Sequence, residues 1–340
     1  MNFIIGNENA IYYECSFSCD NAIYIRLGRD AWFISDARYE IEARERVVGA
    51  EVLITSDLYA KAVEILSSSG VSKVVLDPGE WSLRAYERLK ESGVDFRFEN
   101  DFSHKRRIVK SEEEIARLDK AARLGAKAFD AFAKYIHRKG MGKSERELSF
   151  VAESLLGKKG KYPLSFDPIV ALDENAAKPH AMASKKRVKK GSLLLLDAGL
   201  KYERYCSDRT RTAFVGRNFS FDYEQKFSSK SVQRAYDAVL KAHDRAIARA
   251  KSGMKAARID ALAREVIEKA GFGRYFVHST GHGVGLDIHE MPYISAKSDI
   301  SVEDGMVFTI EPGIYIPGEF GIRVEDTVVM RRGRAEILGI

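Results

Sequence analysis

The sequence predicts an α+β protein with two domains, a smaller N-terminal α/β domain and a larger domain in which helices pack against a largely antiparallel sheet. Three observations lead to this prediction. The chain has 340 residues, which is long for a single hydrophobic core. Short strand and helix patterns alternate up to about residue 105. From residue 111 onward, long amphipathic patterns replace them. We therefore define the domains as 1–108 and 109–340.

The N-terminal domain has the pattern of a mixed sheet. AIYIRL (22–27) and AWFIS (31–35) are rich in β-branched and aromatic residues, and the turn-forming GRD between them predicts a hairpin. EVLIT (51–55) and KVVLD (73–77) predict further strands, with a helix over about 60–70 between them. This alternation favours an α/β domain, and no glycine-rich phosphate loop lies in it.

Four helices are predicted in the second domain, over about 111–136, 144–155, 229–252 and 258–271. The first begins with Ser111 and Glu114 at the spacing of a capping box, and apolar residues then recur every three or four positions. Ser144 and Glu147 repeat this spacing at the second helix, and Gly271 stands where a helix commonly ends. The predicted strands cover 192–198, 201–206, 210–215, 306–316 and 322–330.

Composition and charge argue against several classes of protein. No apolar run reaches the roughly 20 residues that a membrane-spanning helix needs. The first residues lack the features of a signal peptide, so we expect a cytoplasmic protein without a membrane partner. The net charge is +6, and we interpret the basic run KKRVKK at 185–190 as a solvated face, because no aromatic pattern for nucleic-acid binding accompanies it. Cys15 and Cys19 lack the C-x-x-C spacing, which predicts reduced thiols in or near a strand.

The most informative stretch is LDAGLKYERYCSDRTRT, residues 196–212. Asp197 ends an apolar run, and Asp208 follows eleven residues later. A buried carboxylate is costly unless it is paired, hydrogen-bonded or bound to a metal. A hairpin over this stretch would return both carboxylates to one place. Taken alone, the two acids fit an ion-pair network with Arg209 or Arg211 better than a metal site.

Three more residues of the second domain extend this pattern, namely His282 in VHSTGHGVGLDIHE, Glu311 in FTIEPGIY and Glu325 in IRVEDTVV. With the two aspartates they supply four carboxylates and one imidazole, an oxygen-rich set without thiolates. Such a set suits Mn, Co, Fe or Zn in a two-metal hydrolytic centre, because two cations remove the repulsion between the carboxylates. Glycines flank His282 and would let the backbone approach the site closely.

Four motifs, DAG…SDRTRT, HSTGHGVGLDIHE, TIEPGIY and GIRVEDT, resemble in this order the pita-bread metallopeptidases, the family of methionine aminopeptidases, aminopeptidase P and prolidase. NAIYIRLGRDAWFISDARYEIEA resembles the N-terminal domain of aminopeptidase P, prolidase and creatinase, which methionine aminopeptidases generally lack. The resemblance therefore spans nearly the whole chain. It implies a creatinase-like α/β domain at 1–108 before a pita-bread catalytic domain at 109–340, and it points to the proline-specific branch.

The resemblance also implies the roles of individual residues. The ligands of two divalent metal ions, Mn or Co by preference and Zn or Fe as alternatives, would be Asp197, Asp208, His282, Glu311 and Glu325. Asp197 would bind one ion and His282 the other, with Asp208 and Glu325 as bridges. Glu311 would also act as general acid/base on a metal-bridging hydroxide. The remaining expected site residues are His278 and His289 on the substrate side, His180 closing the pocket, and Arg323 orienting the ligands. Expected partners are peptides with proline in second position and a second copy of the chain.

Two departures from the family pattern bear on the substrate. Tyr293 stands where many prolidases have an arginine that could hold the free carboxylate of a dipeptide. This favours an Xaa-Pro aminopeptidase acting on longer peptides. An Xaa-Pro dipeptidase (prolidase) stays the alternative, because another arginine, such as Arg38 of the partner subunit, could replace the missing one. Ala181 replaces a glycine after His180 and should be tolerated unless its φ is positive.

Other classes of function fit less well. A non-catalytic pita-bread module that binds peptides or nucleic acid is the more remote alternative, because all five ligands are present. Metal-independent, creatinase-like C–N hydrolysis is disfavoured for the same reason. The additional N-terminal domain disfavours a methionine aminopeptidase.

Overall fold

A six-stranded mixed sheet forms the centre of the first unit, Met1–Arg107, of the computed structural model, which describes all 340 residues of the chain. Its strands are β1 (Asn2–Ile5), β2 (Ala22–Leu27), β3 (Asp30–Ser35), β4 (Glu51–Ile54), β5 (Lys73–Leu76) and β6 (Asp95–Phe98), in the order β4-β3-β2-β1-β5-β6. Its helices are α1 (Glu8–Cys15), α2 (Glu40–Arg46), α3 (Leu58–Ser68), α4 (Leu83–Lys90) and α5 (Phe102–Arg106). The predicted mixed sheet and the hairpin of β2 and β3 are present.

Residues of β1 show why this sheet is buried on both faces. Phe3 and Ile5 belong to one hydrophobic cluster and Ile4 to another, because successive side chains of a strand point to opposite faces. The predicted reduced thiols are present as free, buried cysteines. Cys15 ends α1, a helix that the sequence did not predict, and packs with the strand residues Phe3 and Phe33, so it lies near strands but not in one. Its Sγ bonds to the carbonyl of Ile11, one helical turn earlier.

The second unit, Ile108–Ile340, contains four long helices and twelve strands. The helices are α6 (Glu112–Tyr135), α7 (Glu145–Gly157), α8 (Lys230–Arg249) and α9 (Ala256–Lys269). The strands are β7 (Ile169–Leu172), β8 (Leu193–Asp197), β9 (Lys201–Tyr202), β10 (Tyr205–Cys206), β11 (Thr210–Phe214), β12 (Gly281–Gly283), β13 (Glu290–Ile294), β14 (Val307–Ile310), β15 (Gly313–Ile316), β16 (Phe320–Arg323), β17 (Asp326–Arg331) and β18 (Arg334–Ile337). None of the helices in either unit is long and apolar enough to cross a membrane.

The ends of these helices follow the local sequence. Both predicted capping boxes form, with Ser111 and Glu114 at α6 and with Ser144 and Glu147 at α7. Gly271 follows α9 with a φ of +87°, a conformation that glycine adopts at low cost. The four predicted helices are therefore confirmed to within a few residues.

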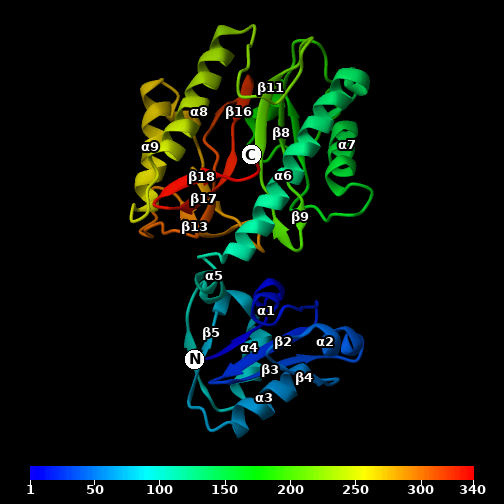
Figure 1. Cartoon of the computed structure of the whole chain (residues 1–340), viewed down its shortest axis with the longest axis vertical. Coiled ribbons are helices and arrows are strands. Elements are labelled where there is room, and N and C mark those ends of the chain that lie inside the picture. Colours follow the sequence, from blue (N-terminus) through cyan, green and yellow to red (C-terminus); the bar gives the residue numbers. More distant parts are fainter. The chain divides into compact units, whose positions relative to one another are not determined.

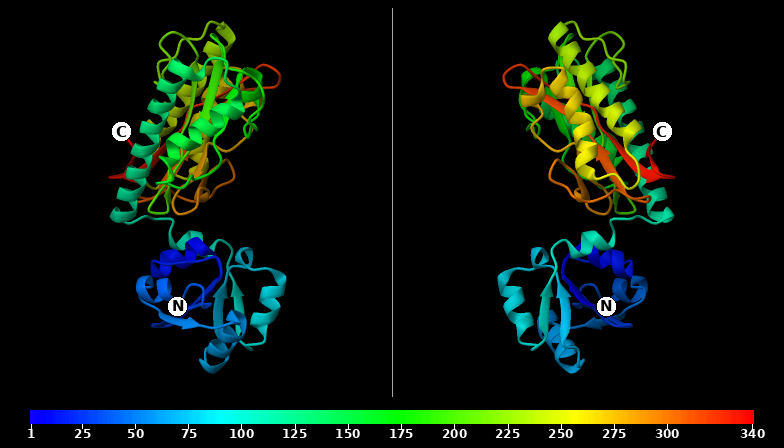
Figure 2. Two further views of the ribbon diagram at one scale, coloured as in Figure 1. Left: turned by 90° about the vertical axis from the view of Figure 1, so that its right-hand side faces the viewer. Right: turned by 90° about the vertical axis from the view of Figure 1, so that its left-hand side faces the viewer.

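The second unit has two halves, each with its own sheet and core. In one half, α6 and α7 pack on the antiparallel sheet β11-β8-β7, and a hydrophobic cluster fills the space between them. In the other half, α8 and α9 pack on the sheet β13-β12-β14-β17-β18 and on the β15–β16 hairpin. Figures 1 and 2 show the two helix pairs on opposite sides of the strands of this unit. The two halves meet where several strands end.

Three predicted strands are interrupted in the structure. The predicted strand 306–316 divides into β14 and β15 at Glu311, and 322–330 divides into β16 and β17 at Glu325. Pro312 has no N–H to donate to a ladder, so the chain leaves one sheet there and pairs in another. The predicted strand 201–206 is instead the small β9–β10 hairpin. Two of the three interruptions place a carboxylate at the junction of the halves.

Candidate metal centre

Two aspartates enter the centre from the sheet β11-β8-β7. Asp197 is the last residue of β8, and Asp208 lies two residues before the start of β11. The two strands pair antiparallel with Thr210 opposite Asp197. The segment that connects them contains the β9–β10 hairpin and brings Asp208 back beside the end of β8. Neither arginine of the rival ion-pair network pairs with these aspartates. Arg211 pairs with Asp326, and the Nε atom of Arg209 is buried without a hydrogen-bond partner.

His282 and two glutamates enter from the other half. His282 is the central residue of β12, between Gly281 and Gly283. A Cβ atom at Gly281 would lie 1.9 Å from the carbonyl oxygen of Thr309, and one at Gly283 would lie 2.3 Å from that of Met291. Glycine is therefore required on both sides of this histidine by close backbone approach. Glu311 follows β14 and Glu325 precedes β17, at the two strand interruptions.

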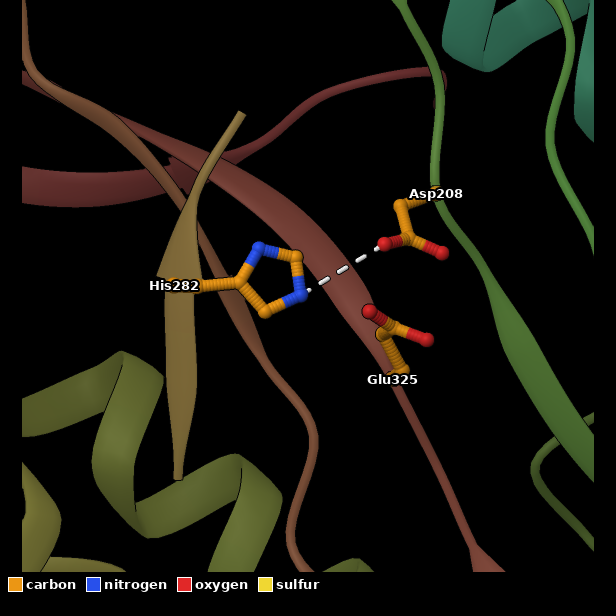
Figure 3. Close-up of side chains that lie close together, drawn as sticks. All are labelled: Asp208, His282 and Glu325. Atoms are coloured by element: carbon orange, nitrogen blue, oxygen red, sulfur yellow. Dashed lines mark ion pairs between the residues drawn. The ribbon is translucent and has the colours of Figure 1, made fainter. Parts of the chain in front are cut away.

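Three of these side chains lie especially close together. Asp208, His282 and Glu325 each offer a ligand atom, and these atoms all lie within 4.8 Å of one another. Figure 3 shows the three side chains pointing toward one another from three separate segments. The Nε2 atom of His282 lies 3.6 Å from Oδ2 of Asp208 and 3.3 Å from Oε1 of Glu311. Its Nδ1 atom lies 3.1 Å from the carbonyl oxygen of Gly283, which directs Nε2 toward the carboxylates.

The carboxylates repel one another in the absence of a cation. Burial raises the pKa of Asp208 and of Glu325 well above the ordinary range, and the charges of neighbouring carboxylates raise it further. Burial also raises the pKa of Asp197, although Arg323 opposes this. Oδ1 of Asp197 and Oε1 of Glu325 are buried without a hydrogen-bond partner. Unpaired buried oxygens in an acidic cluster fit a bound cation, which would satisfy them and relieve the repulsion.

Glu311 differs from the other three acids. Burial would raise its pKa, but the hydrogen bond and charge of His282, with the charges of His278 and Arg323, lower it to about 2. The same pairing raises the pKa of His282 against the effect of burial. Glu311 is therefore ionised, whereas burial and repulsion favour the neutral forms of Asp208 and Glu325.

Arg323, the last residue of β16, connects several parts of the site. Its Nη2 atom lies 2.5 Å from Oδ2 of Asp197, and its Nε donates to Oγ1 of Thr210 at 3.0 Å. The Thr210 hydroxyl in turn donates to Oε2 of Glu325 at 2.6 Å. A second guanidinium nitrogen, Nη1, donates to the hydroxyl of Tyr315 at 2.8 Å. Arg323 thus holds one acid directly and a second through a threonine.

All ten residues expected at the site line one cavity of about 410 Å³. The complete lining consists of Phe166, Asp167, Ile169, Pro179, His180, Asp197, Asp208, His278, Ser279, His282, Ile288, His289, Tyr293, Glu311, Arg323 and Glu325. The four acids expected to bind metal are buried or nearly so, whereas Asp167, His180, His289 and Tyr293 are exposed. Ala181 is absent from the residues with positive φ, so the replacement of glycine at this position causes no backbone strain.

The sequence analysis missed Tyr315, which lies on β15 and is buried. Its hydroxyl lies 2.9 Å from Nε2 of His278, whose Nδ1 lies 2.7 Å from the carbonyl oxygen of Ser279. Burial lowers the pKa of His278 and raises the pKa of Tyr315 to about 12. These contacts favour a neutral imidazole that donates from Nδ1 and accepts from the tyrosine hydroxyl at Nε2. The strand pattern of GIYI gave Tyr315 the appearance of a core residue.

The apolar part of the lining was also not predicted. Phe166 comes from the segment that leads into β7, Ile169 is the first residue of β7, and Ile288 comes from the loop before β13. No motif marks Phe166 and Ile169, and Ile288 stands in the motif HSTGHGVGLDIHE as an apolar residue without a predicted role, because only the folded chain brings the three to the cavity. They give the acidic centre an apolar side.

Comparisons with known proteins show the family to which the chain belongs. The sequence matches the model of metallopeptidase family M24 over residues 116–332, more than half of the chain. The Xaa-Pro dipeptidase of Pyrococcus horikoshii is 34% identical over 336 residues, which cover 98% of this chain and 91% of that protein. The structure resembles an Xaa-Pro dipeptidase from Bacillus anthracis with a TM-score of 0.91 and 34% identity, covering 99% of this chain and 92% of the other. It also resembles an X-Pro aminopeptidase from Thermotoga maritima with a TM-score of 0.87 and 32% identity, covering 100% and 95%.

The chain therefore belongs to metallopeptidase family M24, which confirms the resemblance that the four motifs indicated. It is a metallopeptidase with a mixed α/β fold, and membership of this family implies divalent metal ions. The buried cluster of Asp208, His282 and Glu325 fits that requirement.

Proposed function

We propose that this metallopeptidase is a two-metal exopeptidase that hydrolyses the bond before proline, with Xaa-Pro dipeptides as its substrates. The observation that carries the proposal is the convergence on one cavity of Asp197, Asp208, His282, Glu311 and Glu325. These five residues would hold the two ions. Mn or Co is favoured, with Zn or Fe as alternatives, because the set is rich in carboxylate oxygen and has one imidazole. When bound, such ions act as Lewis acids and lower the pKa of a coordinated water.

Glu311 is the proposed general acid/base. Its carboxylate is ionised, so it can take a proton from the attacking water. The same carboxyl group then gives this proton to the proline nitrogen as the amide bond breaks. The amide before proline carries no N–H, so recognition of this bond needs no acceptor for such a hydrogen.

The histidines would orient the substrate around this carboxylate. His278 is held by the hydroxyl of Tyr315 and the carbonyl of Ser279, which fixes its ring beside the acids. Both ring nitrogens are used by these contacts, so His278 would steady the attacked carbonyl only by exchanging its hydrogen bond with Tyr315 for an Nε2–H donated to the substrate. His289 and His180 lie exposed along the same cavity, where they would contact the proline end.

The choice of dipeptidase rests on the relatives. Xaa-Pro dipeptidases from Pyrococcus horikoshii and Bacillus anthracis are similar over nearly the whole chain, which favours the alternative of the sequence analysis over its first choice. An Xaa-Pro aminopeptidase remains the second candidate, because Tyr293 and not an arginine lines the cavity and because the Thermotoga maritima structure carries that name. A second copy of the chain also remains a predicted partner, which analytical ultracentrifugation would test.

Two matched peptides test this function. EDTA-stripped protein is supplied with Mn, Co or Zn and given an Xaa-Pro dipeptide or an Xaa-Pro-Yaa tripeptide with the same first residue. Metal-dependent cleavage of the dipeptide in preference to the tripeptide is the expected result. Preference for the tripeptide would replace the dipeptidase by the aminopeptidase, and no metal-dependent cleavage of either would refute the proposed function.

A substitution at Tyr293 sharpens this test. Tyr293→Arg would restore the guanidinium that many prolidases have here, and a substrate carboxylate would pair with it. We expect the variant to raise kcat/KM for the dipeptide several-fold while the tripeptide changes little. Tyr293→Phe serves as the control, since it keeps the ring and adds no charge.

A further inference from the structure

Glu145 is a fully buried carboxylate outside the cavity. It is the first residue of α7, and its exposed fraction is 0%. Oε1 accepts a hydrogen bond from the backbone N–H of Leu172 at 2.7 Å. Oε2 accepts one from Nδ2 of Asn175 at 2.8 Å and one from the backbone N–H of Ser184 at 2.7 Å. No ion pair accompanies these bonds, so hydrogen-bond donors alone stabilise the buried carboxylate.

The three donors belong to one segment. Residues 172–184, here named the pocket loop, begin at the end of β7 and include His180, which lines the cavity. Asn175 also donates from Nδ2 to the carbonyl oxygen of Met182 at 3.1 Å, which ties the two ends of the loop together. Glu145 thus contacts the loop on both sides of His180.

A second charged group holds the same loop from the direction of the candidate metal centre. Nη1 of Arg323 donates to the carbonyl oxygen of Pro179 at 3.3 Å, and Nη2 of the same side chain binds Asp197. The residue before His180 is therefore fixed to the acid cluster, while Glu145 fixes the two ends of the loop. The position of His180 relative to Asp197 depends on both attachments.

Helix capping does not explain Glu145. The N-terminus of α7 is capped by Ser144 and Glu147, which satisfy each other's backbone N–H groups. Glu145 lies between them and directs its carboxylate away from its own helix toward the pocket loop. The structure needs this carboxylate for the loop and not for the helix.

We propose that Glu145 is a positioning residue for substrate binding, which holds the pocket loop so that His180 faces the cavity. This inference rests on the proposed function, in which His180 contacts the proline end of the substrate. Glutamine cannot replace the carboxylate, because its amide group offers one acceptor oxygen and presents N–H groups to a donor. An unsatisfied donor in this buried place would move the loop.

Steady-state kinetics of Glu145→Gln and the matched Glu147→Gln test the proposal. Both substitutions remove one charge from the first turn of α7, but only Glu145 touches the pocket loop. We expect Glu145→Gln to raise KM for Xaa-Pro peptides about tenfold, with a smaller change in kcat and unchanged metal content. Glu147→Gln should keep the kinetic constants of the natural protein. Equal kinetics in the two variants would overturn the proposal.

A double-mutant cycle tests whether the effect passes through His180. If Glu145 acts by placing that imidazole, the double variant Glu145→Gln/His180→Ala should have nearly the same kcat/KM as His180→Ala alone. Multiplicative losses would show that Glu145 acts elsewhere and would overturn the proposal. If Glu145→Gln fails to fold, Asn175→Ala takes its place in the double-mutant cycle. This variant removes one of the three donors to Glu145, and we expect it to raise KM about threefold.

Hydrogen exchange provides a readout that does not depend on the reaction. In Glu145→Gln, peptides that cover residues 172–184 should exchange their amide hydrogens faster, whereas in Glu147→Gln they should not. Unchanged exchange in Glu145→Gln would refute the positioning role even if the enzyme cleaves Xaa-Pro bonds. If exchange is faster in Glu145→Gln but the natural protein cleaves neither peptide, the proposed function is refuted. The conclusion that Glu145 holds the pocket loop would then still stand.

Discussion

Arg211 on β11 and Asp326 on β17 form a buried ion pair, with Nη2 2.8 Å from Oδ1, between the two sheets that carry the candidate ligands. Arg211 also bonds to the backbone carbonyl of Glu325, and Nε2 of His243 on α8 lies 3.1 Å from Oδ2 of Asp326. The carboxylate is therefore shared by an arginine and a histidine directly behind a candidate metal ligand. This cluster holds the two halves of the second unit at the place where the ligands meet.

The cluster predicts how stability depends on pH. Burial would raise the pKa of Asp326, but the charges of Arg211 and of the adjacent His243 imidazole lower it further than burial raises it. Asp326 therefore stabilises the folded protein at pH values above its unfolded pKa of about 3.9. This stabilisation is lost as the pH falls through the pKa of Asp326 in the folded protein. Burial would lower the pKa of His243, but Asp244 and Asp326 raise it. His243 therefore stabilises the folded protein fully below about pH 6.5, its unfolded pKa. This stabilisation is lost as the pH rises through the pKa of His243 in the folded protein.

Urea unfolding of the metal-free protein checks this prediction. Between pH 6 and pH 8 the natural protein should lose more of its unfolding free energy than His243→Gln does, because only the natural protein has the imidazole with the raised pKa. A loss of the same size in both proteins would mean that His243 carries no charge linked to folding.

Asp208→Asn should separate stability from metal binding. The raised pKa of Asp208 means that its ionised form destabilises the metal-free fold above the unfolded pKa. The neutral amide removes this repulsion, so we expect metal-free Asp208→Asn to be more stable than the metal-free natural protein at pH 7, and we expect the variant to lose metal binding and activity together. Exposed Asp237 on α8 provides the control, because Asp237→Asn should change neither property. An active variant without metal would contradict the proposed centre.

Metal binding should release protons. Burial and mutual repulsion keep the pKa values of Asp208 and Glu325 high without a cation, whereas ligation requires both to be ionised. The affinity for Mn should therefore increase with pH until both groups ionise without metal. Calorimetric titrations in two buffers of different ionisation enthalpy measure the protons released. Equal heats in the two buffers would contradict the raised pKa values.

His278 and Tyr315 should act on the reaction without holding metal. His278→Ala should retain metal and lose most of kcat, because the imidazole is expected on the substrate side. Tyr315→Phe removes the hydroxyl that fixes this imidazole and contacts Arg323, so we expect a fall in kcat of about tenfold, equivalent to about 1.4 kcal/mol. Metal analysis and steady-state kinetics of both variants provide the check. Loss of metal in His278→Ala would place this histidine among the ligands.

Local patterns explain why much of the fold could be predicted. Ser111 and Ser144 begin helices with hydrogen bonds that reach only three residues, so the sequence contains all the partners involved. The apolar run before Asp197 and the prompt return at Asp208 likewise predict a strand and its neighbour. The interruption at Glu311 was missed because MVFTIEPGIYI reads as one apolar strand, although Pro312 marks the point at which pairing changes.

Residues whose partners lie far along the chain could not be predicted. Glu145 reads as an acidic residue in the first turn of a helix, yet its donors lie 27 to 39 residues away. Asp326 meets Arg211 only when the two sheets come together, across 115 positions of sequence. Neither spacing nor periodicity contains such contacts, because tertiary packing creates them.

Titration of EDTA-stripped protein with Mn, followed by both bound metal and hydrolysis of an Xaa-Pro dipeptide, tests the central claim most directly. We expect two ions to bind per chain and activity to return with them, and we expect His282→Ala to bind fewer ions without recovering activity. Folded protein that binds no metal at the five residues, or that hydrolyses the dipeptide equally well without metal, would contradict a two-metal centre formed by Asp197, Asp208, His282, Glu311 and Glu325.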